Sequence, residues 1–450
     1  MKKIKIYFLL HSKAFWPSWK SFWHACKLDS KIETKVIFCP VTKTEKGRDG
    51  QFVDTEEWLK ENNIDYIHIN NINILFDRPD VVFLQLPYDG YRTEAYKSSR
   101  LKQYLINLSY ISYGLEFTEA PYNIKNHFKL PFFSNSWRIY TFNKSLIKDF
   151  WKYCPKGSKH VKCLGHPKFD ALYEAQKVKM PEWLKEKIGG RKVICWHPHF
   201  PCDYSTKKGK PIISTFPWQE NLKILDYIKK DEENFYIFMA HHMFFGTFEH
   251  KYNIPHDDIE NFKEQLSVST NSIIWEGEYP EILAWSDVFL GERSAVTMEM
   301  ITTNKPVIYL ENCPEVYNQF GKDVIKSYYY ASNADTALDF LEKIKSGQDE
   351  KSEKRQKTFE KYILPYWDGQ CGERIKNDII CSRKELQISF FDLIKAYLIT
   401  FVKEISNNIL SYQIVRRVSA KHLVIKILGI KLKIRLKSEK IADRGVELID

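Results

Sequence analysis

Residues Glu281 to Glu311 read EILAWSDVFLGERSAVTMEMITTNKPVIYLE, and this stretch decides the fold class. The apolar run Asp287–Leu290 predicts a strand, Ser294 can cap a helix that opens at Ala295, and Val307–Leu310 predicts the next strand. This order is typical of a right-handed β-α-β crossover, which leaves the helix N-terminus at the carboxyl end of a parallel strand. Because free backbone N–H groups there attract anions, both a nucleotide-diphosphate site and an ordinary capped crossover helix remain open.

The same alternation of strands and helices extends outward over most of the chain. A charged stretch, Gln176–Arg191, separates two series of strands. Two tandem α/β units predict an α/β protein with two facing Rossmann-like domains and a cleft between them, at residues 1–165 and 166–380. The predicted strands are Ile4–Leu10, Thr34–Phe38, Tyr66–Ile69, Val81–Gln85, Leu105–Ser112, Arg138–Phe142 and Val161–Leu164, then Val193–Trp196, Tyr236–Ala240, Ile273–Trp275, Val288–Leu290 and Val307–Leu310.

Composition excludes several classes of protein. The 450 residues contain no GxGxxG and no GxxxxGK[ST], which argues against a dinucleotide-binding dehydrogenase and a P-loop NTPase. Nine cysteines without a CxxC pair favour reduced thiols in a cytosolic compartment and argue against structural zinc. The net charge of +11 suits polyanionic partners, whether phosphate-bearing substrates, an anionic membrane face or nucleic acid.

The residues from Cys381 to Asp450 form a separate basic segment. It holds 14 Lys and Arg against 7 Asp and Glu, so it carries +7 of the total charge. Apolar residues recur at helical spacing at Phe390, Ile394, Tyr397, Leu398, Phe401, Val402 and Ile405, and Ile425–Lys437 alternates apolar and basic residues around Gly429. This pattern predicts a hairpin or strand with a cationic face, suited either to an anionic membrane surface or to packing and dimerisation.

Five motifs in order along the chain resemble those of the CDP-glycerol glycerophosphotransferases, the teichoic-acid polymerase family. The motifs are Gly165–Asp170 (GHPKFD), Trp196–Phe200 (WHPHF), Phe238–Met243 (FMAHHM), Ser286–Glu299 (SDVFLGERSAVTME) and Asp368–Ile375 (DGQCGERI). They are similar to the family's G-Y-P-R-N-D, Y-A-P-T-W-R, strand-H-P, S-D-x-L-I-T-D-Y-S-S-x-x-F-D and D-G-x-A-x-x-R-I elements. The resemblance implies a GT-B fold, a cytidine-diphosphate donor bound in the C-terminal domain, and an acceptor bound in the N-terminal domain.

The chain departs from the family at several positions. Glu292 and Ala295 stand where the family has Asp and a second Ser, and Ala240 replaces a basic residue. The family's H-G-T-P-L-K element, which carries its catalytic base, has no match, and Tyr110–Glu116 is the corresponding region. The transferred group could therefore differ from glycerol phosphate.

The resemblance and the chemistry of diphosphate cleavage select a donor site. Its predicted residues are Gly165, Pro167, Lys168, Pro198, His199, Glu292, Ser294, Ala295 and Glu299. Negative charge grows on the leaving phosphate, so the Ser294 hydroxyl, the backbone N–H groups after it and His242 are suitable donors. His197 is a further candidate beside His199, and the resemblance implies that Glu299 holds a ribose.

The acceptor hydroxyl needs a general base, for which the sequence offers three residues. His11, Asp89 and Glu116 each follow a predicted strand of the N-terminal domain, and the sequence does not choose among them. No Asp-x-Asp motif occurs, so we expect no obligatory metal and no cofactor beyond the CDP-activated donor.

Taken with these residues, the resemblance predicts an enzyme of cell-surface polysaccharide biosynthesis, such as a capsule or a teichoic-acid-like polymer. It would move glycerol phosphate from CDP-glycerol to a glycan or lipid-linked acceptor and release CMP. The alternatives are a GT-B glycosyltransferase that uses a nucleotide sugar and a non-enzymatic polyanion-binding protein. We expect no nucleic-acid partner, because no recognisable module is present and the charge gathers in the basic segment. The expected location is the cytoplasm, peripherally on the inner face of the plasma membrane.

Overall fold

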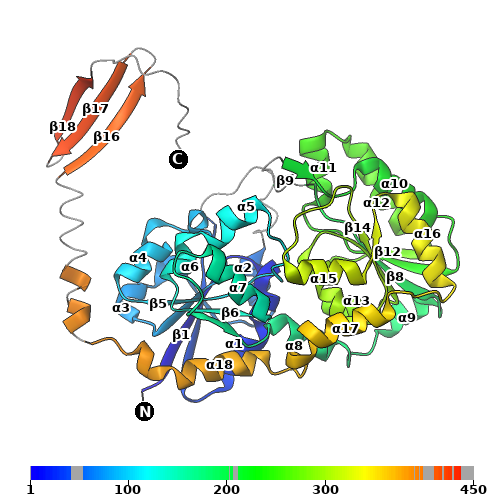
Figure 1. Cartoon of the computed structure of the whole chain (residues 1–450), viewed down its shortest axis with the longest axis horizontal. Coiled ribbons are helices and arrows are strands. Elements are labelled where there is room, and N and C mark those ends of the chain that lie inside the picture. The colour runs from blue at the N-terminus through cyan, green and yellow to red at the C-terminus, as the bar shows by residue number, and fades with distance from the viewer. Residues whose placement is uncertain are drawn as a thin grey trace. The chain divides into compact units, whose positions relative to one another are not determined.

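The computed structural model of the chain describes residues 2–41, 54–201, 203–205, 211–389, 391–394, 396–398, 410–417, 420–427 and 430–436 (Figure 1). The chain divides into two compact units. One holds residues 1–102 and 106–387, and the other holds 103–105 and 388–450. The larger unit contains two parallel sheets.

The first sheet has seven parallel strands in the order β3-β2-β1-β4-β5-β6-β7. Its strand β1 (Ile4–Leu10) matches the predicted bounds, and all of its side chains except Lys5 are buried, which is typical of a central parallel strand. The other strands are β2 (Ile32–Phe38), β3 (Tyr66–His68), β4 (Val81–Leu84), β5 (Asn107–Ile111), β6 (Arg138–Thr141) and β7 (Val161–Cys163). The helices between them include α1 (Lys20–Leu28), α2 (Thr55–Glu61), α3 (Ile74–Asp77), α4 (Ser98–Gln103), α5 (Pro121–Asn123), α6 (Pro131–Asn135) and α7 (Lys144–Tyr153).

The second sheet has six parallel strands in the order β12-β11-β8-β13-β14-β15. The strands are β8 (Lys192–His197), β11 (Asn234–Phe238), β12 (Ser272–Ile274), β13 (Val288–Glu292), β14 (Val307–Leu310) and β15 (Tyr329–Ala331). The helices are α9 (Glu182–Ile188), α10 (Trp218–Ile228), α11 (Phe244–Tyr252), α12 (His256–Val268), α13 (Pro280–Trp285), α14 (Ala295–Glu299), α15 (Gln319–Ser327), α16 (Ala334–Lys345) and α17 (Ser352–Tyr362). The predicted β-α-β crossover is therefore confirmed as β13, α14 and β14, although β13 runs on through Gly291 and Glu292.

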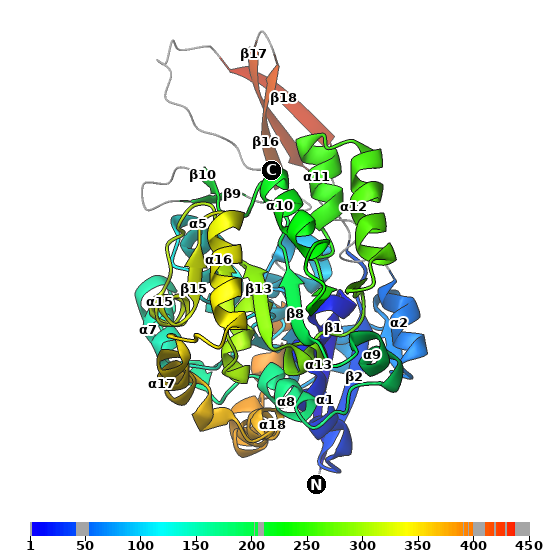
Figure 2. The same ribbon diagram turned by 90° about the vertical axis from the view of Figure 1, so that its right-hand side faces the viewer.

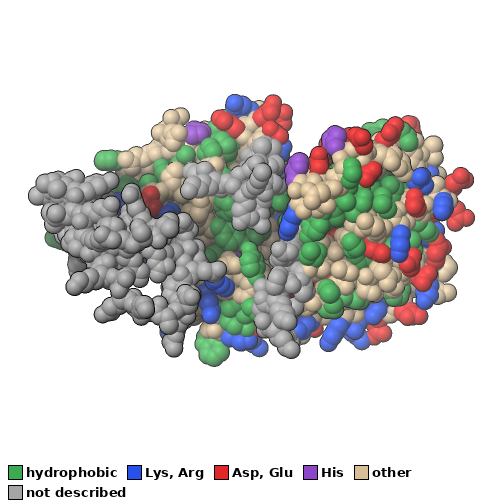
Figure 3. All heavy atoms as spheres, turned by 90° about the horizontal axis from the view of Figure 1, so that it is seen from above, with side chains coloured by type: hydrophobic (Ala, Val, Ile, Leu, Met, Phe, Trp, Pro, Cys, Tyr) green, Lys and Arg blue, Asp and Glu red, His purple; other side chains and the backbone are tan. Residues whose placement is uncertain are grey.

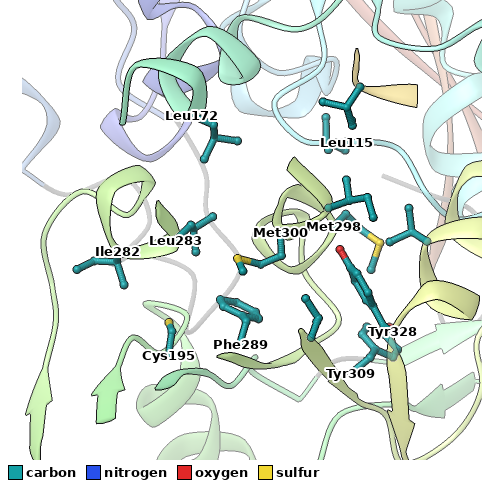
Figure 4. Close-up of a cluster of buried hydrophobic side chains, with 14 of the residues drawn as sticks. Leu115, Leu172, Cys195, Ile282, Leu283, Phe289, Met298, Met300, Tyr309 and Tyr328 are labelled. Carbon is teal, nitrogen blue, oxygen red and sulfur yellow. The ribbon is translucent and has the colours of Figure 1, made fainter. Parts of the chain in front are cut away.

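One of the buried apolar clusters contains residues of both domains. Leu115 and Phe142 of the first sheet's domain belong to the same buried cluster as Met298 and Phe289 of the second (Figure 4). Helix α8 (Pro167–Ala175), which follows β7, and α18 (Cys371–Cys381), near the end of the unit, both pack on α1 (Figure 2). The chain thus returns to the first domain after it has built the second.

The described surface mixes acidic and basic side chains. Seen from above, the second domain carries both kinds interspersed, with histidines among them (Figure 3). The positive charge of the chain is therefore not gathered on this face of the domain.

The smaller unit contains a three-stranded antiparallel sheet in the order β16-β17-β18. Strands β17 (Ala420–Ile427) and β18 (Ile430–Leu436) pair as the predicted hairpin, while β16 (Leu410–Arg417) was not predicted. Residues 391–394 and 396–398 are helical, and the predicted helical positions Phe390, Phe401, Val402 and Ile405 lie outside the described residues, as does Gly429. Within the described part of the chain, no helix is both long and apolar enough to cross a membrane. The division at residues 165 and 380 stays a prediction.

Candidate active site

The turn after β7 joins the two domains through the GHPKFD motif. Gly165 has φ +90°, and a Cβ added to it would lie 2.5 Å from Cys371 Sγ. Pro167 occupies the first turn of α8, and His166 caps that helix by accepting from the backbone N–H of Lys168. The other ring nitrogen of His166 lies 2.8 Å from the carbonyl oxygen of Ser112, which follows β5. Gly165 and Pro167 therefore shape the junction itself.

Lys168 and Glu299 form a buried ion pair at this junction. Lys168 Nζ donates to Glu299 Oε1 at 2.8 Å, and the two side chains are 6% and 0% exposed. The Tyr279 hydroxyl donates to the other oxygen, Oε2, at 2.7 Å. The ion pair therefore links α8 to α14. Both carboxylate oxygens of Glu299, the residue predicted to hold a ribose, already accept hydrogen bonds from protein side chains.

Ser294 caps α14, as the sequence predicts. Its Oγ accepts from the backbone N–H of Thr297 at 3.0 Å. The next residue, Ala295, meets the first domain, because a Cβ added to Gly114 would lie 3.0 Å from Ala295 Cβ. The start of α14 therefore lies against the segment that follows β5.

Glu292 is a buried carboxyl group that holds two loops. Its Oε2 accepts from the backbone N–H of His199 at 2.8 Å, and its Oε1 accepts from that of Phe216 at 2.8 Å. Burial raises the pKa of Glu292 to about 8. The side chain thus positions the loop after β8 rather than projecting from the site.

Four histidines gather where β8 and β11 end, and we call them the histidine group: His197, His199, His241 and His242. The His199 and His241 rings lie 4.6 Å apart, and the His241 and His242 rings 4.1 Å. The backbone N–H of His241 donates to the Pro198 carbonyl at 2.9 Å, which joins the two loops.

Burial favours the neutral form of all four members of the histidine group. It lowers the pKa of His197 and of His242 to about 4 and that of His199 to about 3, and it also lowers the pKa of His241. A neutral imidazole carries a single N–H group. In His197 and His199 Nδ1 faces the carbonyl oxygen of Met239 and of Phe200, so this N–H is already engaged. In His241 Nδ1 accepts from the backbone N–H of Met243, which leaves the Nε2–H group to donate to a phosphate or a base edge. The sequence analysis missed His241, although its place beside His242 after a buried strand was a usable signal.

Two of the three predicted general bases are engaged within the first domain. His11 is fully buried after β1, its Nδ1 lies 2.9 Å from the Cys39 carbonyl oxygen, and burial lowers its pKa to about 3. Asp89 accepts from Arg92 Nη2 at 2.6 Å and from the Ser98 hydroxyl at 2.6 Å. Through these contacts, both side chains stabilise loops of the first domain.

Glu116, the third predicted base, lies at the domain junction. Its backbone carbonyl accepts from Asn318 Nδ2 of the second domain at 3.1 Å. Its carboxylate Oε1 lies 3.4 Å from Nε2 of His127, a residue that the sequence analysis did not consider. Nearby, Arg293 pairs with Glu315, and its guanidinium lies 5.2 Å from the centre of the Phe117 ring.

The described residues include no group of three or more His, Cys, Asp or Glu side chains placed to hold a metal ion. The expectation of a metal-independent reaction stays a prediction.

Solved structures of similar shape identify the fold. MnaA from S. aureus, in its UDP co-structure, is 14% identical, with 86% of this chain and 98% of that chain covered and a TM-score of 0.56. The wall teichoic acid polymerase TagF is 12% identical, with 85% and 89% covered and a TM-score of 0.55. The UDP-GlcNAc 2-epimerase from Neisseria meningitidis, bound to UDP-GlcNAc, is 14% identical, with 84% and 99% covered and a TM-score of 0.54. The predicted GT-B fold is confirmed.

None of the curated proteins matches this sequence. A family model described as CDP-Glycerol:Poly(glycerophosphate) glycerophosphotransferase matches residues 111–381, which is more than half of the chain. The matched region includes Glu116, the GHPKFD turn, the histidine group and the start of α14. The chain is therefore a transferase that belongs to the CDP-glycerol:poly(glycerophosphate) glycerophosphotransferase family.

Proposed function

We propose that the protein transfers glycerol phosphate from CDP-glycerol to a hydroxyl group of a glycan or a lipid-linked acceptor and releases CMP. The reaction would build or decorate a polymer of the cell surface, such as wall teichoic acid or a related capsule. The family membership of residues 111–381 is the observation that carries this proposal.

The proposed donor site is formed by the strand ends of the second domain. The loop after β8 with His199, the loop after β11 with His242, and the Ser294 cap of α14 converge there through Glu292 and the Pro198 carbonyl. When the bond to CMP breaks, negative charge grows on the CMP phosphate, and preorganised donors at that oxygen supply much of the catalysis. The Ser294 hydroxyl and the imidazole of His242 are donors suited to this task.

Glu299 is proposed to act on the ribose through its carboxylate oxygens. Each oxygen has further lone pairs beyond those that accept from Lys168 and Tyr279. The proposed reaction requires no metal or cofactor, because the donor itself carries the activated phosphate bond that is broken.

A second candidate is a GT-B glycosyltransferase that uses a nucleotide sugar. The absence of a histidine within Tyr110–Glu116, the region that corresponds to the family's base element, favours it. The similar fold of proteins solved with UDP and UDP-GlcNAc is compatible with it.

The basic segment is proposed to hold the enzyme at an anionic membrane surface on the cytoplasmic side. Lipid-linked acceptors lie there, and each Lys or Arg near such a surface contributes about 1 kcal/mol. The 14 Lys and Arg after residue 380 supply this attraction.

A donor screen tests the proposal. CDP-glycerol, UDP-GlcNAc and RNA are each titrated against the purified protein, and the melting temperature is recorded. A ligand present at 100 times its Kd stabilises the folded state by about 2.7 kcal/mol, so CDP-glycerol is expected to raise the melting temperature. A response to UDP-GlcNAc alone would favour the glycosyltransferase, and a response to RNA alone would contradict both enzymes.

Site variants sharpen the screen. Ser294→Ala is expected to lower turnover roughly tenfold to a thousandfold, the scale of losing one donor to a developing anion. Ser267→Ala is the matched control, because its hydroxyl donates to a helix carbonyl on an exposed face of α12 and its loss leaves turnover unchanged. Equal turnover in the two variants would remove Ser294 from the donor site.

A further inference from the structure

A carboxylate and an imidazole face each other beside the domain junction. Glu116 follows β5, and His127 lies on the π-helix η6 (Ile124–Phe128). Glu116 Oε1 and His127 Nε2 are 3.4 Å apart, and the two side chains are 14% and 12% exposed. The pair is therefore largely, but not completely, withdrawn from solvent.

The polar atoms around this pair are short of partners. Among the described residues, Glu116 Oε2, Asn123 Oδ1 and Asp149 Oδ2 are buried and have no hydrogen-bond partner, and His127 Nε2 faces only Glu116 Oε1, at 3.4 Å. An unsatisfied buried polar group lowers the stability of the folded protein by about 1–3 kcal/mol. Several such groups in one region of the fold therefore need an explanation, such as a ligand that binds there. A ligand that brings hydroxyl groups would satisfy them.

The backbone at His127 is itself unusual. A π-helix is rare, and single turns of it occur frequently at functional sites because they redirect side chains. The His127 ring is held by edge-to-face contacts with Phe128 at 5.0 Å and Phe133 at 4.7 Å between ring centres. These contacts fix its orientation toward Glu116.

The segment that carries the pair lies against the second domain. The Glu116 carbonyl accepts from Asn318 Nδ2, and helix α5, which leads directly into η6, contacts β9 (Asp203–Ser205). Phe117, the next residue after Glu116, lies under the guanidinium of Arg293, which is adjacent to Ser294. The pair thus lies on the side of the first domain that meets the second domain near Ser294. Figure 1 shows α5, which precedes η6, on this side.

We propose that His127 is the general base that activates the acceptor hydroxyl, and that Glu116 is the positioning residue that orients its ring. This inference rests on the proposed function. The acceptor oxygen forms a bond to the phosphorus that bears the glycerol, and the bond from that phosphorus to the CMP oxygen breaks. Since Glu116 Oε1 faces Nε2 of His127, Nε2 carries the hydrogen of the unprotonated ring and Nδ1 accepts the hydroxyl proton. The carboxylate of Glu116 stabilises the resulting imidazolium, and the proton then leaves to solvent.

The test compares turnover with donor binding in variants of the full-length protein. His127→Gln keeps the size of the side chain but cannot accept a proton, and it is expected to lower kcat by about 10²–10⁴-fold, the usual share of general base catalysis. The Kd for CDP-glycerol, measured by calorimetry, is expected to stay within about twofold, because the proposal assigns His127 to the acceptor hydroxyl and not to donor binding. Free imidazole is expected to restore part of the turnover of His127→Ala.

Glu116 is tested through its dependence on His127. Glu116→Gln is expected to lower kcat roughly tenfold at an unchanged Kd for CDP-glycerol. The double variant is expected to lose no more than His127→Gln alone, because groups that act as a unit are not additive. A double variant whose losses multiply would overturn the positioning role.

His160→Gln is the matched control. His160 is a buried histidine of the first domain, and its Nε2 lies 3.0 Å from the carbonyl oxygen of Phe133, whose ring also contacts His127. It is expected to keep wild-type turnover. Wild-type turnover in His127→Gln, with the wild-type protein active on CDP-glycerol, overturns this inference alone. A wild-type protein that releases no CMP from CDP-glycerol with any acceptor overturns the proposed function, and the inference falls with it.

Discussion

At the residue scale, the ion pair between Lys168 and Glu299 has the clearest consequence for stability. Lys168→Met leaves the Glu299 carboxylate buried with only the Tyr279 hydroxyl as a partner, and the free energy of unfolding is expected to fall by about 3–5 kcal/mol. Urea denaturation followed by circular dichroism measures it.

The control is Lys177→Met, which breaks an exposed ion pair with Glu174 and is expected to leave the free energy of unfolding almost unchanged, because water screens such a pair. If the two variants lose equal stability, the buried pair contributes no more than a surface one.

The sequence predicts which residues lie in the site better than it predicts their contacts. The types and positions of His199, Glu292 and Ser294 could be read from motifs, because each follows an apolar strand. Their partners could not, since the carboxylate of Glu292 reaches the backbone of His199 and Phe216, which lie 93 and 76 residues away. His127 was missed for the same reason, because only the fold brings it to Glu116.

At the element scale, the turn from β7 into α8 depends on one glycine. Gly165→Ala would place a methyl group 2.5 Å from Cys371 Sγ and would force a left-handed backbone on alanine. The expected loss is more than the roughly 1–3 kcal/mol of backbone strain alone, because α18 must also move. Thermal unfolding of the variant measures this.

Gly157→Ala is the comparison, because Gly157 has φ +72° and no atom within 4 Å of an added Cβ. The stability that Gly157→Ala loses therefore measures the backbone strain alone, without a steric clash. If Gly165→Ala lowers the free energy of unfolding no more than Gly157→Ala does, then α18 can move away from the added methyl group at little cost.

Elements with a strong local pattern were predictable. Strand β1 has the predicted bounds, because an unbroken apolar run favours a buried strand. The π-helix η6 was not predictable, since it depends on packing against α7 rather than on local sequence. Strand β16 was missed because Leu410–Arg417 has only its pairing with β17 to define it.

At the scale of the whole molecule, buried histidines set the response to acid. Burial lowers the pKa of six histidines to about 3 or 4, namely His11, His160, His166, His197, His199 and His242. The unfolded chain binds protons at these groups below about pH 6.5 while the folded chain does not, so stability falls as the pH falls toward 4.

Three buried carboxyl groups act in the opposite sense. Burial raises the pKa of Asp149 to about 6, of Glu311 to about 7 and of Glu292 to about 8, so their contribution to stability falls as the pH rises through this range. We expect maximal stability near about pH 6 to 7, measured as the urea midpoint against pH. His160→Gln is expected to reduce the loss between pH 6.5 and 4, and an unchanged slope would contradict the account.

The smaller unit is expected to bind membranes by charge. Vesicles with anionic lipid should bind the full-length protein, binding should weaken with added salt, and neutral vesicles should not bind. Replacing Lys431, Lys433 and Arg435 of β18 by Gln should reduce vesicle binding while leaving CDP-glycerol binding intact. Sedimentation with vesicles measures it, and salt-insensitive binding would indicate a packing or dimerisation role instead.

The most direct test of the proposed function follows the transferred group. Wild-type protein is incubated with CDP-glycerol labelled in the glycerol and with glycan and lipid-linked acceptors, and the released nucleotide and the labelled product are both quantified. The account predicts one CMP for each glycerol phosphate attached to an acceptor. Release of CDP instead of CMP, or transfer from UDP-GlcNAc with none from CDP-glycerol, would contradict it.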